Sequence, residues 1–305
     1  MTQNGSYNNV PEKKSIRLAN GETYAYFDLG ANQKSPEPFL LIHGNSSSSV
    51  HFLPLFSRLT SVRLIAPDLR GFGDSSYNAH FSSLRELAED VKLFADALGI
   101  SKAHVVGWST GGGIAFELAV LYPDLVSSLF IIEGAGHKGF PLYKKNPDGS
   151  FVPFASKEEL AADPILIAPA LAAHDAHNSA FFDVLWDKSI YINKKPGAEE
   201  GKLYISETLK QRNLVDLDWA LATFNMSDGH NGYTMGSGTI GKIKCPVTIT
   251  CADKDMLVPP ATSRENAAAI KGAKLLEYEN CGHSPLVDCP DRLAADILAH
   301  AGRVS

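Results

Sequence analysis

The chain has 305 residues, which is long enough for one large α/β domain or two smaller ones. Its hydrophobic content of 44% and charged content of 20% are ordinary for a soluble globular enzyme, and it holds no run of about 18 apolar residues that could span a membrane. The net charge of -6 supplies no basic surface, so the composition argues against a nucleic-acid partner and gives no reason to expect a membrane partner.

The first residues and the cysteines indicate the compartment. Residues 1–14 are polar and lack the apolar core of a secretory signal or membrane anchor, so we expect a flexible N-terminal tail and a cytoplasmic protein. The cysteines lie in the last quarter of the chain without Cys-x-x-Cys spacing, which favours buried or partly exposed thiols over metal ligands. They are Cys245, Cys251, Cys281 and Cys289. We expect no metal site.

Strand and helix patterns alternate over most of the chain. Residues 15–30 alternate apolar and polar side chains around Asn20-Gly21, which predicts an antiparallel hairpin. Short apolar, β-branched segments predict further strands at 39–42, 62–66, 104–106, 129–132, 247–250 and 274–278. Helical patterns at 83–98, 112–121, 264–270 and 290–300 lie between most of them. We therefore predict an α/β fold, with a mostly parallel eight-stranded sheet and helices on both faces.

A long insertion interrupts this alternation between residues 135 and 241. It shows no buried strand but contains four helical patterns, at 157–162, 164–173, 180–190 and 214–224. A structureless loop of this length would be unusual inside a domain. We interpret the segment as a helical cap inserted into a core made of residues 15–134 and 242–305.

A serine flanked by glycines is the strongest chemical signal in the chain. Ser109 stands in the run Gly107–Trp108–Ser109–Thr110–Gly111, between a predicted buried strand and a predicted helix. The glycines let strand and helix approach closely around a strained turn, which holds the serine hydroxyl out at the carboxyl edge of the sheet. The same pattern also occurs in ordinary strand-to-helix turns, so its interpretation as a nucleophile depends on partners elsewhere in the chain.

A serine nucleophile needs a base to remove its proton and an acid to orient that base. His283 follows the last predicted strand and would reach the same sheet edge as Ser109, so it is the predicted base. Asp255 follows the penultimate strand, which gives the chain order Ser109, Asp255, His283. Glu133 follows the strand after Ser109 and is the alternative acid, because both positions are geometrically allowed.

Acyl transfer also requires backbone donors where negative charge develops on the substrate oxygen. We expect one donor to be the amide of Thr110, directly after the nucleophile. The second is expected from the loop after the strand at 39–42, where Gly44 permits a turn and the Asn45 amide would point inward. The serines that follow could also make this loop an ordinary polar turn and helix cap.

The order of these motifs resembles that of a known superfamily. His43–Asn45, Asp68–Ser75 and Gly107–Gly112 are followed by Asp255 and Gly282–His283. This order resembles the α/β-hydrolase superfamily over residues 20–134 and 242–303. The resemblance implies the α/β-hydrolase fold with an inserted cap and, because serine hydrolases such as carboxylesterases share these motifs, an ester-cleaving enzyme.

A shorter likeness concerns lactone hydrolases. The loop 43–48 together with Gly107–Ser109 is similar to some acyl-homoserine lactone hydrolases of the superfamily. Glu133 occupies a place where certain lactone hydrolases keep their triad acid. The resemblance does not extend to the cap, which is the part that would determine the substrate.

The predicted pocket lies between the cap and the sheet edge, and aromatic side chains are the candidates for lining it. Any one of them could instead pack in the core of the cap or in its seam with the main domain. The predicted substrate-binding residues are Trp108, Trp186, Tyr191 and Trp219.

These observations predict a cofactor-independent serine hydrolase that cleaves a small-molecule carboxylic ester or lactone through an acyl-enzyme. The same triad could hydrolyse a carbon–carbon bond next to a ketone, or carry out perhydrolysis. A protein of a different class, a ligand receptor on a hydrolase fold with slow turnover, would keep the same motifs.

Overall fold

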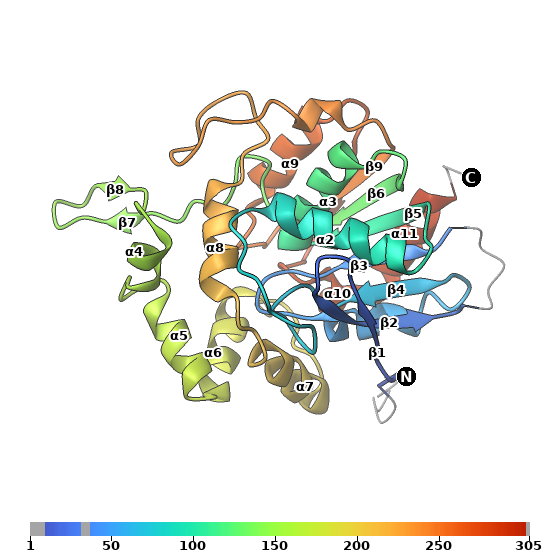
Figure 1. The fold of residues 1–305 in the computed structure, drawn as a ribbon, viewed down its shortest axis with the longest axis horizontal. Helices are drawn as coiled ribbons and strands as arrows, with labels where there is room; N and C mark the ends of the chain where they lie inside the picture. The colour runs from blue at the N-terminus through green and yellow to red at the C-terminus, as the bar shows by residue number, and fades with distance from the viewer. Residues whose placement is uncertain (1–9, 32–36, 303–305) are drawn as a thin grey trace.

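The computed structural model describes residues 10–31 and 37–302, so residues 1–9 of the expected tail lie outside the described residues. Within these ranges, eight strands form one sheet in the spatial order β1-β2-β4-β3-β5-β6-β9-β10. β2 pairs antiparallel with β1 and β4, and all other neighbours pair parallel, which confirms the predicted sheet (Figure 1). The strands are β1 (Lys14–Arg17), β2 (Thr23–Leu29), β3 (Phe39–Ile42), β4 (Leu64–Pro67), β5 (Ala103–Trp108), β6 (Val126–Ile132), β9 (Val247–Ala252) and β10 (Lys274–Tyr278).

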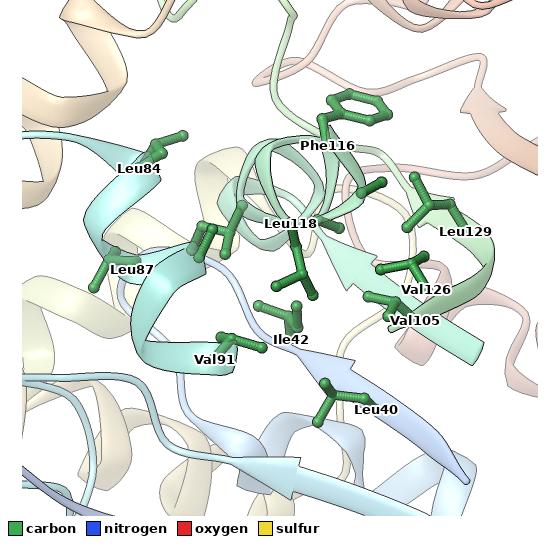
Figure 2. Packing of buried hydrophobic residues seen from close by; sticks show 14 of the residues in the cluster. Leu40, Ile42, Leu84, Leu87, Val91, Val105, Phe116, Leu118, Val126 and Leu129 are labelled. Carbon is green, nitrogen blue, oxygen red and sulfur yellow. The ribbon is translucent and has the colours of Figure 1, made fainter. Parts of the chain in front are cut away.

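Helices cover both faces of the sheet because successive strand residues point to opposite sides. Leu40 and Ile42 of β3 lie in one apolar cluster with residues of α2 (Leu84–Ala97) and α3 (Thr110–Leu121), as Figure 2 shows. Phe39 and Leu41 lie in the opposite cluster with residues of α1 (Leu53–Phe56) and α11 (Pro290–Ala301). The core is completed by η1 (Ser49–Phe52), η2 (Ile240–Lys242), α9 (Pro260–Ala269) and α10 (Pro285–Asp288).

The N-terminal hairpin is tied to the rest of the molecule by a partly buried ammonium group. Lys13, directly before β1, places its Nζ 2.7 Å from Asp68, 2.9 Å from Asp74 and 3.3 Å from Glu207. Burial opposes the charge, but the carboxylates of Asp68 and Glu207 raise the pKa of Lys13 above its usual value. Because Glu207 belongs to the cap, this one side chain joins the first strand to both the core and the cap.

The insertion between β6 and β9 consists mainly of helices, which Figure 1 shows to one side of the sheet. They are α4 (Lys157–Ala161), α5 (Ala168–Asp175), α6 (Ser179–Ser189), α7 (Ala198–Thr208) and α8 (Leu214–Thr223), with a short hairpin of β7 (Lys144–Lys145) and β8 (Phe151–Val152). The sequence patterns missed α7, which carries Gly201 in its interior. Burial of Tyr204 and Thr208 on one side of α7 outweighs that unfavourable residue.

The remaining sequence expectations concern membranes and thiols. In the described part of the chain, no helix combines the length and the apolar character that a membrane span requires. All four cysteines are free thiols, and two of them, Cys281 and Cys289, have their Sγ atoms 3.8 Å apart.

Candidate active site

Ser109 lies at the sharp turn between β5 and α3, with φ of 56° and ψ of -122°. This left-handed backbone is costly for a residue with a side chain, and such strain concentrates at functional sites. Glycines make the turn feasible. A Cβ on Gly107 would lie 2.4 Å from the Gly111 carbonyl oxygen, and a Cβ on Gly111 would lie 2.1 Å from the Ile42 carbonyl oxygen. Strand, turn and helix can therefore pack this closely only with glycine at both positions.

The structure brings Ser109, His283 and Asp255 into one hydrogen-bonded line. The Ser109 Oγ lies 2.9 Å from His283 Nε2, and His283 Nδ1 lies 2.7 Å from Asp255 Oδ2. An ionised carboxylate can only accept, so Nδ1 carries the ring proton of a neutral imidazole and Nε2 is left to accept from the serine hydroxyl. This is the arrangement in which a histidine can remove the serine proton.

Backbone and indole groups fix the two partners of Ser109. Asp255 Oδ1 accepts from the amides of Leu257 and Val258, each at 2.9 Å, which leaves Oδ2 directed at His283. Trp108, next to the nucleophile, donates its Nε1–H to the carbonyl oxygen of His283 at 2.9 Å. The indole thus holds the histidine loop against the turn that carries the serine.

Glu133, the alternative acid, is directed elsewhere. Its carboxylate accepts from the hydroxyl of Thr250 at 2.6 Å and from the amide of Ala252 at 3.0 Å, both on β9. Complete burial, and then the charge of Asp255, raise the pKa of Glu133 to about 7. Glu133 is therefore a second buried carboxyl whose hydrogen bonds go to β9. The carboxylate that is hydrogen-bonded to His283 is that of Asp255.

The two expected oxyanion donors, Asn45 and Thr110, both line the cavity that contains Ser109 and His283. Thr110 is the first residue of α3, where an amide has no acceptor inside its own helix. A Cβ on Gly44 would lie 2.8 Å from the Ser109 Cβ. Glycine at this position therefore lets the loop of Asn45 lie against the nucleophile.

His43 anchors this loop to the core. Its Nε2 lies 3.0 Å from the amide of Leu69, and its Nδ1 lies 2.8 Å from the carbonyl oxygen of Gly44. Burial lowers the pKa of His43 to about 4, so the ring is neutral near pH 7, with one nitrogen accepting and the other donating. Sequence reasoning gave His43 no role, although a histidine next to this glycine was visible there.

The cavity measures about 230 Å³ and lies between the core and the cap. Two of the four predicted lining residues, Trp108 and Trp186, do line it. Tyr191 and Trp219 are not among its lining residues. Tyr191 packs on Trp186 with ring centroids 5.2 Å apart, and Trp219 packs edge-on against Tyr233 within the cap. In the structure, both of these side chains pack against other aromatic rings.

Most of the cavity wall comes from residues that sequence reasoning did not single out. The wall also includes Ser46, Ala135, Phe140, Leu185, Ser189, Ile190, Asp218, Leu221, Leu257 and Val258. Leu185 and Ser189 are four residues apart on α6, and Asp218 and Leu221 are three apart on α8. This helical spacing was a usable signal, but the sequence did not show which face of each cap helix meets the core.

Asp218 is the unexpected charge-bearing group in the cavity. Its Oδ1 accepts from the side-chain amide Nδ2 of Asn45 at 2.9 Å. Burial raises the pKa of Asp218 to about 7, although the hydrogen bond from Asn45 opposes that change.

Comparison with known proteins shows the family to which this chain belongs. The family model of the alpha/beta hydrolase fold matches residues 37–290, and the chain belongs to that family. Among curated relatives, "Lipase 1" of Psychrobacter immobilis is 29% identical over 294 residues, covering 94% of this chain and 83% of the lipase.

Solved structures show the same fold at lower identity. An esterase from Exiguobacterium antarcticum matches with a TM-score of 0.74 and 20% identity, covering 95% of this chain and 99% of the esterase. The enol-lactonase from Burkholderia xenovorans LB400 matches with a TM-score of 0.72 and 18% identity, covering 95% of this chain and 100% of the enol-lactonase. The fold prediction made from the motifs is thus confirmed.

Proposed function

We propose that this protein hydrolyses small carboxylic esters or lactones, with Ser109 as nucleophile, His283 as general base and Asp255 as the acid that orients it. The observation that carries the proposal is the hydrogen-bonded line from Asp255 through His283 to Ser109. This line opens on a cavity whose wall is largely apolar, as a neutral ester requires. The lipase relative supports the ester-cleaving class.

The geometry accounts for both halves of the reaction. Ser109 Oγ attacks the ester carbonyl carbon while its proton moves to His283 Nε2, and the oxyanion accepts from the amides of Asn45 and Thr110. His283 then gives the proton to the leaving alkoxide oxygen, and an acyl group stays on Ser109. A water molecule, deprotonated by His283, attacks the acyl carbonyl, which releases the carboxylic acid and restores the serine.

Covalent trapping tests the nucleophile directly. We expect a fluorophosphonate probe to label Ser109, as mapped by mass spectrometry of the digested protein. Ser109→Ala should lose at least about 10³-fold in kcat on p-nitrophenyl butyrate. Ser206→Ala, at an exposed position of α7, is the matched control and should keep full activity. Undiminished hydrolysis by Ser109→Ala would refute the proposal.

Paired variants of the two carboxyls test the acid. Asp255→Asn should lower kcat by about 10³- to 10⁴-fold, because its amide would no longer stabilise the imidazolium that forms on His283. Glu133→Gln should lower kcat less than about tenfold, since its carboxyl contacts β9 and not the imidazole. A larger fall for Glu133→Gln than for Asp255→Asn would make Glu133 the acid of the triad.

A substrate panel separates the ester and lactone chemistries from the alternatives. We expect turnover of short p-nitrophenyl esters or of unsubstituted lactones. Turnover of a diketone without turnover of any ester would assign carbon–carbon bond hydrolysis instead. Ligand-dependent thermal stabilisation without turnover of any compound in the panel would favour a receptor.

A further inference from the structure

Asp218 is a carboxyl in the substrate cavity for which the proposed triad has no use. It stands on the cap helix α8, and its side chain is almost fully buried, with 8% of the residue exposed. Among the cavity-lining residues it is the one acidic side chain, in a largely apolar wall that also includes Leu221 and Phe140. Burying a carboxyl in such surroundings costs stability unless its oxygens find hydrogen-bond donors.

The hydrogen bonds of Asp218 are incomplete. Oδ1 accepts from Asn45 Nδ2 at 2.9 Å, and within the described ranges no other hydrogen bond reaches this carboxyl. A carboxylate can accept at both oxygens, and buried polar groups in proteins are rarely left with such capacity unused. Once the carboxyl is ionised, above about pH 7, the second oxygen therefore offers an acceptor to a ligand in the cavity.

The side-chain amide of its partner Asn45 is held in one orientation, with the NH₂ group toward Asp218. Asn45 Oδ1 accepts from the amide of Ser46 at 2.8 Å and from Gln211 Nε2 at 2.9 Å. Both groups are donors, so the oxygen of the Asn45 side chain must face them and its NH₂ must face Asp218. Asp218 is thus hydrogen-bonded to the residue whose backbone amide is a proposed oxyanion donor, and it lines the same cavity as Ser109.

Orienting Asn45 is not a sufficient reason for a carboxyl at this position. A neutral amide at residue 218 would accept from Asn45 Nδ2 equally well, without the cost of a buried ionisable group. A carboxylate adds a second acceptor on a residue that lines the cavity. A neutral donor on the ligand suits this acceptor better than a cation, because a cation would have to lose its water in a largely apolar cavity.

We propose that Asp218 is a specificity-determining residue that binds a neutral hydrogen-bond donor, a hydroxyl or an amide N–H, located near the scissile carbonyl of the substrate. This inference rests on the proposed function, and it narrows the substrate class to esters or lactones that carry such a donor. A site built to bind a polar group discriminates strongly against the analogue that lacks it, since its own buried group is then left unpaired.

The test compares p-nitrophenyl butyrate with p-nitrophenyl 2-hydroxybutyrate and 3-hydroxybutyrate. The wild-type protein should favour one hydroxy ester over butyrate by about tenfold or more in kcat/KM, after division by the uncatalysed rates. In Asp218→Asn, the amide can keep its oxygen on Asn45 Nδ2 and present NH₂ to the cavity, so a donor replaces the acceptor. The preference should then fall about tenfold. Asp183→Asn, an exposed carboxyl of α6, is the matched control and should keep the wild-type preference.

Two outcomes would overturn the inference. One is a wild-type protein that shows no preference for either hydroxy ester, a result that depends on no variant. The other is an equal loss on all three esters in Asp218→Asn, which would mean that Asp218 acts only by orienting Asn45.

A binding measurement separates this inference from the proposed function. In the Ser109→Ala background, calorimetry with the same three esters should show tighter binding of a hydroxy ester, and Asp218→Asn should abolish the difference. If Ser109→Ala hydrolyses the esters as fast as the wild type, the proposed function fails. The Asp218 inference is then tested separately, by whether Asp218→Asn lowers the preference for a hydroxy ester over butyrate in kcat/KM.

Discussion

Glu133→Gln should change how the stability of the protein depends on pH. The Glu133 carboxyl is completely buried, and burial together with the charge of Asp255 raises its pKa from 4.5 to about 7. Each pH unit between the unfolded and folded values corresponds to about 1.4 kcal/mol, so ionised Glu133 lowers the free energy of unfolding by roughly 3 kcal/mol.

The sign follows from proton binding in the two states. Below pH 4.5, the carboxyl is protonated in both the folded and the unfolded chain, and it exerts no penalty. Between pH 4.5 and about 7, the folded chain holds the proton more tightly than the unfolded chain, so stability falls as the pH rises. Above about pH 7 both forms are ionised, and the penalty is complete.

Urea unfolding from about pH 4 to about pH 8 measures this effect. The free energy of unfolding of Glu133→Gln, minus that of the wild type, should rise by about 3 kcal/mol over this range. Taking the difference cancels the contributions of groups that do not interact with Glu133, including Asp218. Glu279→Gln, at an exposed position, is the control and should give a difference that does not change with pH. A pH-independent difference for Glu133→Gln would refute the reasoning.

Four further variants test contacts within the site and in its surroundings. Gly44→Ala should lower kcat on p-nitrophenyl butyrate at least about tenfold, because the new Cβ would lie 2.8 Å from the Ser109 Cβ; an unchanged kcat would contradict the close packing. Arg70→Met should destabilise the protein by about 3 kcal/mol in urea unfolding, since it leaves Asp90 buried without the two 2.7 Å bonds from the guanidinium. Arg70→Lys should restore only part of that loss, and a full restoration would argue against bidentate pairing. Trp219→Leu should lower the melting temperature while KM stays within about twofold of wild type, because the indole packs inside the cap; a large rise in KM would instead place Trp219 at the substrate.

Local chemistry in the sequence determined the turn that carries Ser109 and the sheet. The glycines at 107 and 111 permit one kind of turn, and its strand and helix are both marked by patterns within a few residues. The alternation of apolar segments with helical periodicity predicted a mostly parallel sheet, because parallel strands need such crossovers. The placement of Ser109 at the sheet edge follows from these short-range features alone.

The choice between the two carboxyls needed the tertiary structure. Asp255 and Glu133 both follow strands that end at the same edge, so their positions along the chain do not distinguish them. Glu133 is turned away from the imidazole by Thr250 and Ala252, more than a hundred residues further along the chain. Contacts between residues so distant in sequence form only when the strands have assembled.

The cavity wall depends even more on assembly. Of the aromatic residues predicted to line it, Trp186 does so, whereas Trp219 faces the interior of the cap. Asp218 is one of many polar residues in the cap sequence, and nothing in the sequence marks it as a cavity residue. The structure places it in the cavity wall, hydrogen-bonded to Asn45. The sequence thus determined the fold and which candidate catalytic side chains follow the strand ends at the sheet edge. Tertiary structure decided which side chains line the cavity, because a cap helix presents a different set of residues with every rotation about its axis, and only its packing on the core fixes that rotation.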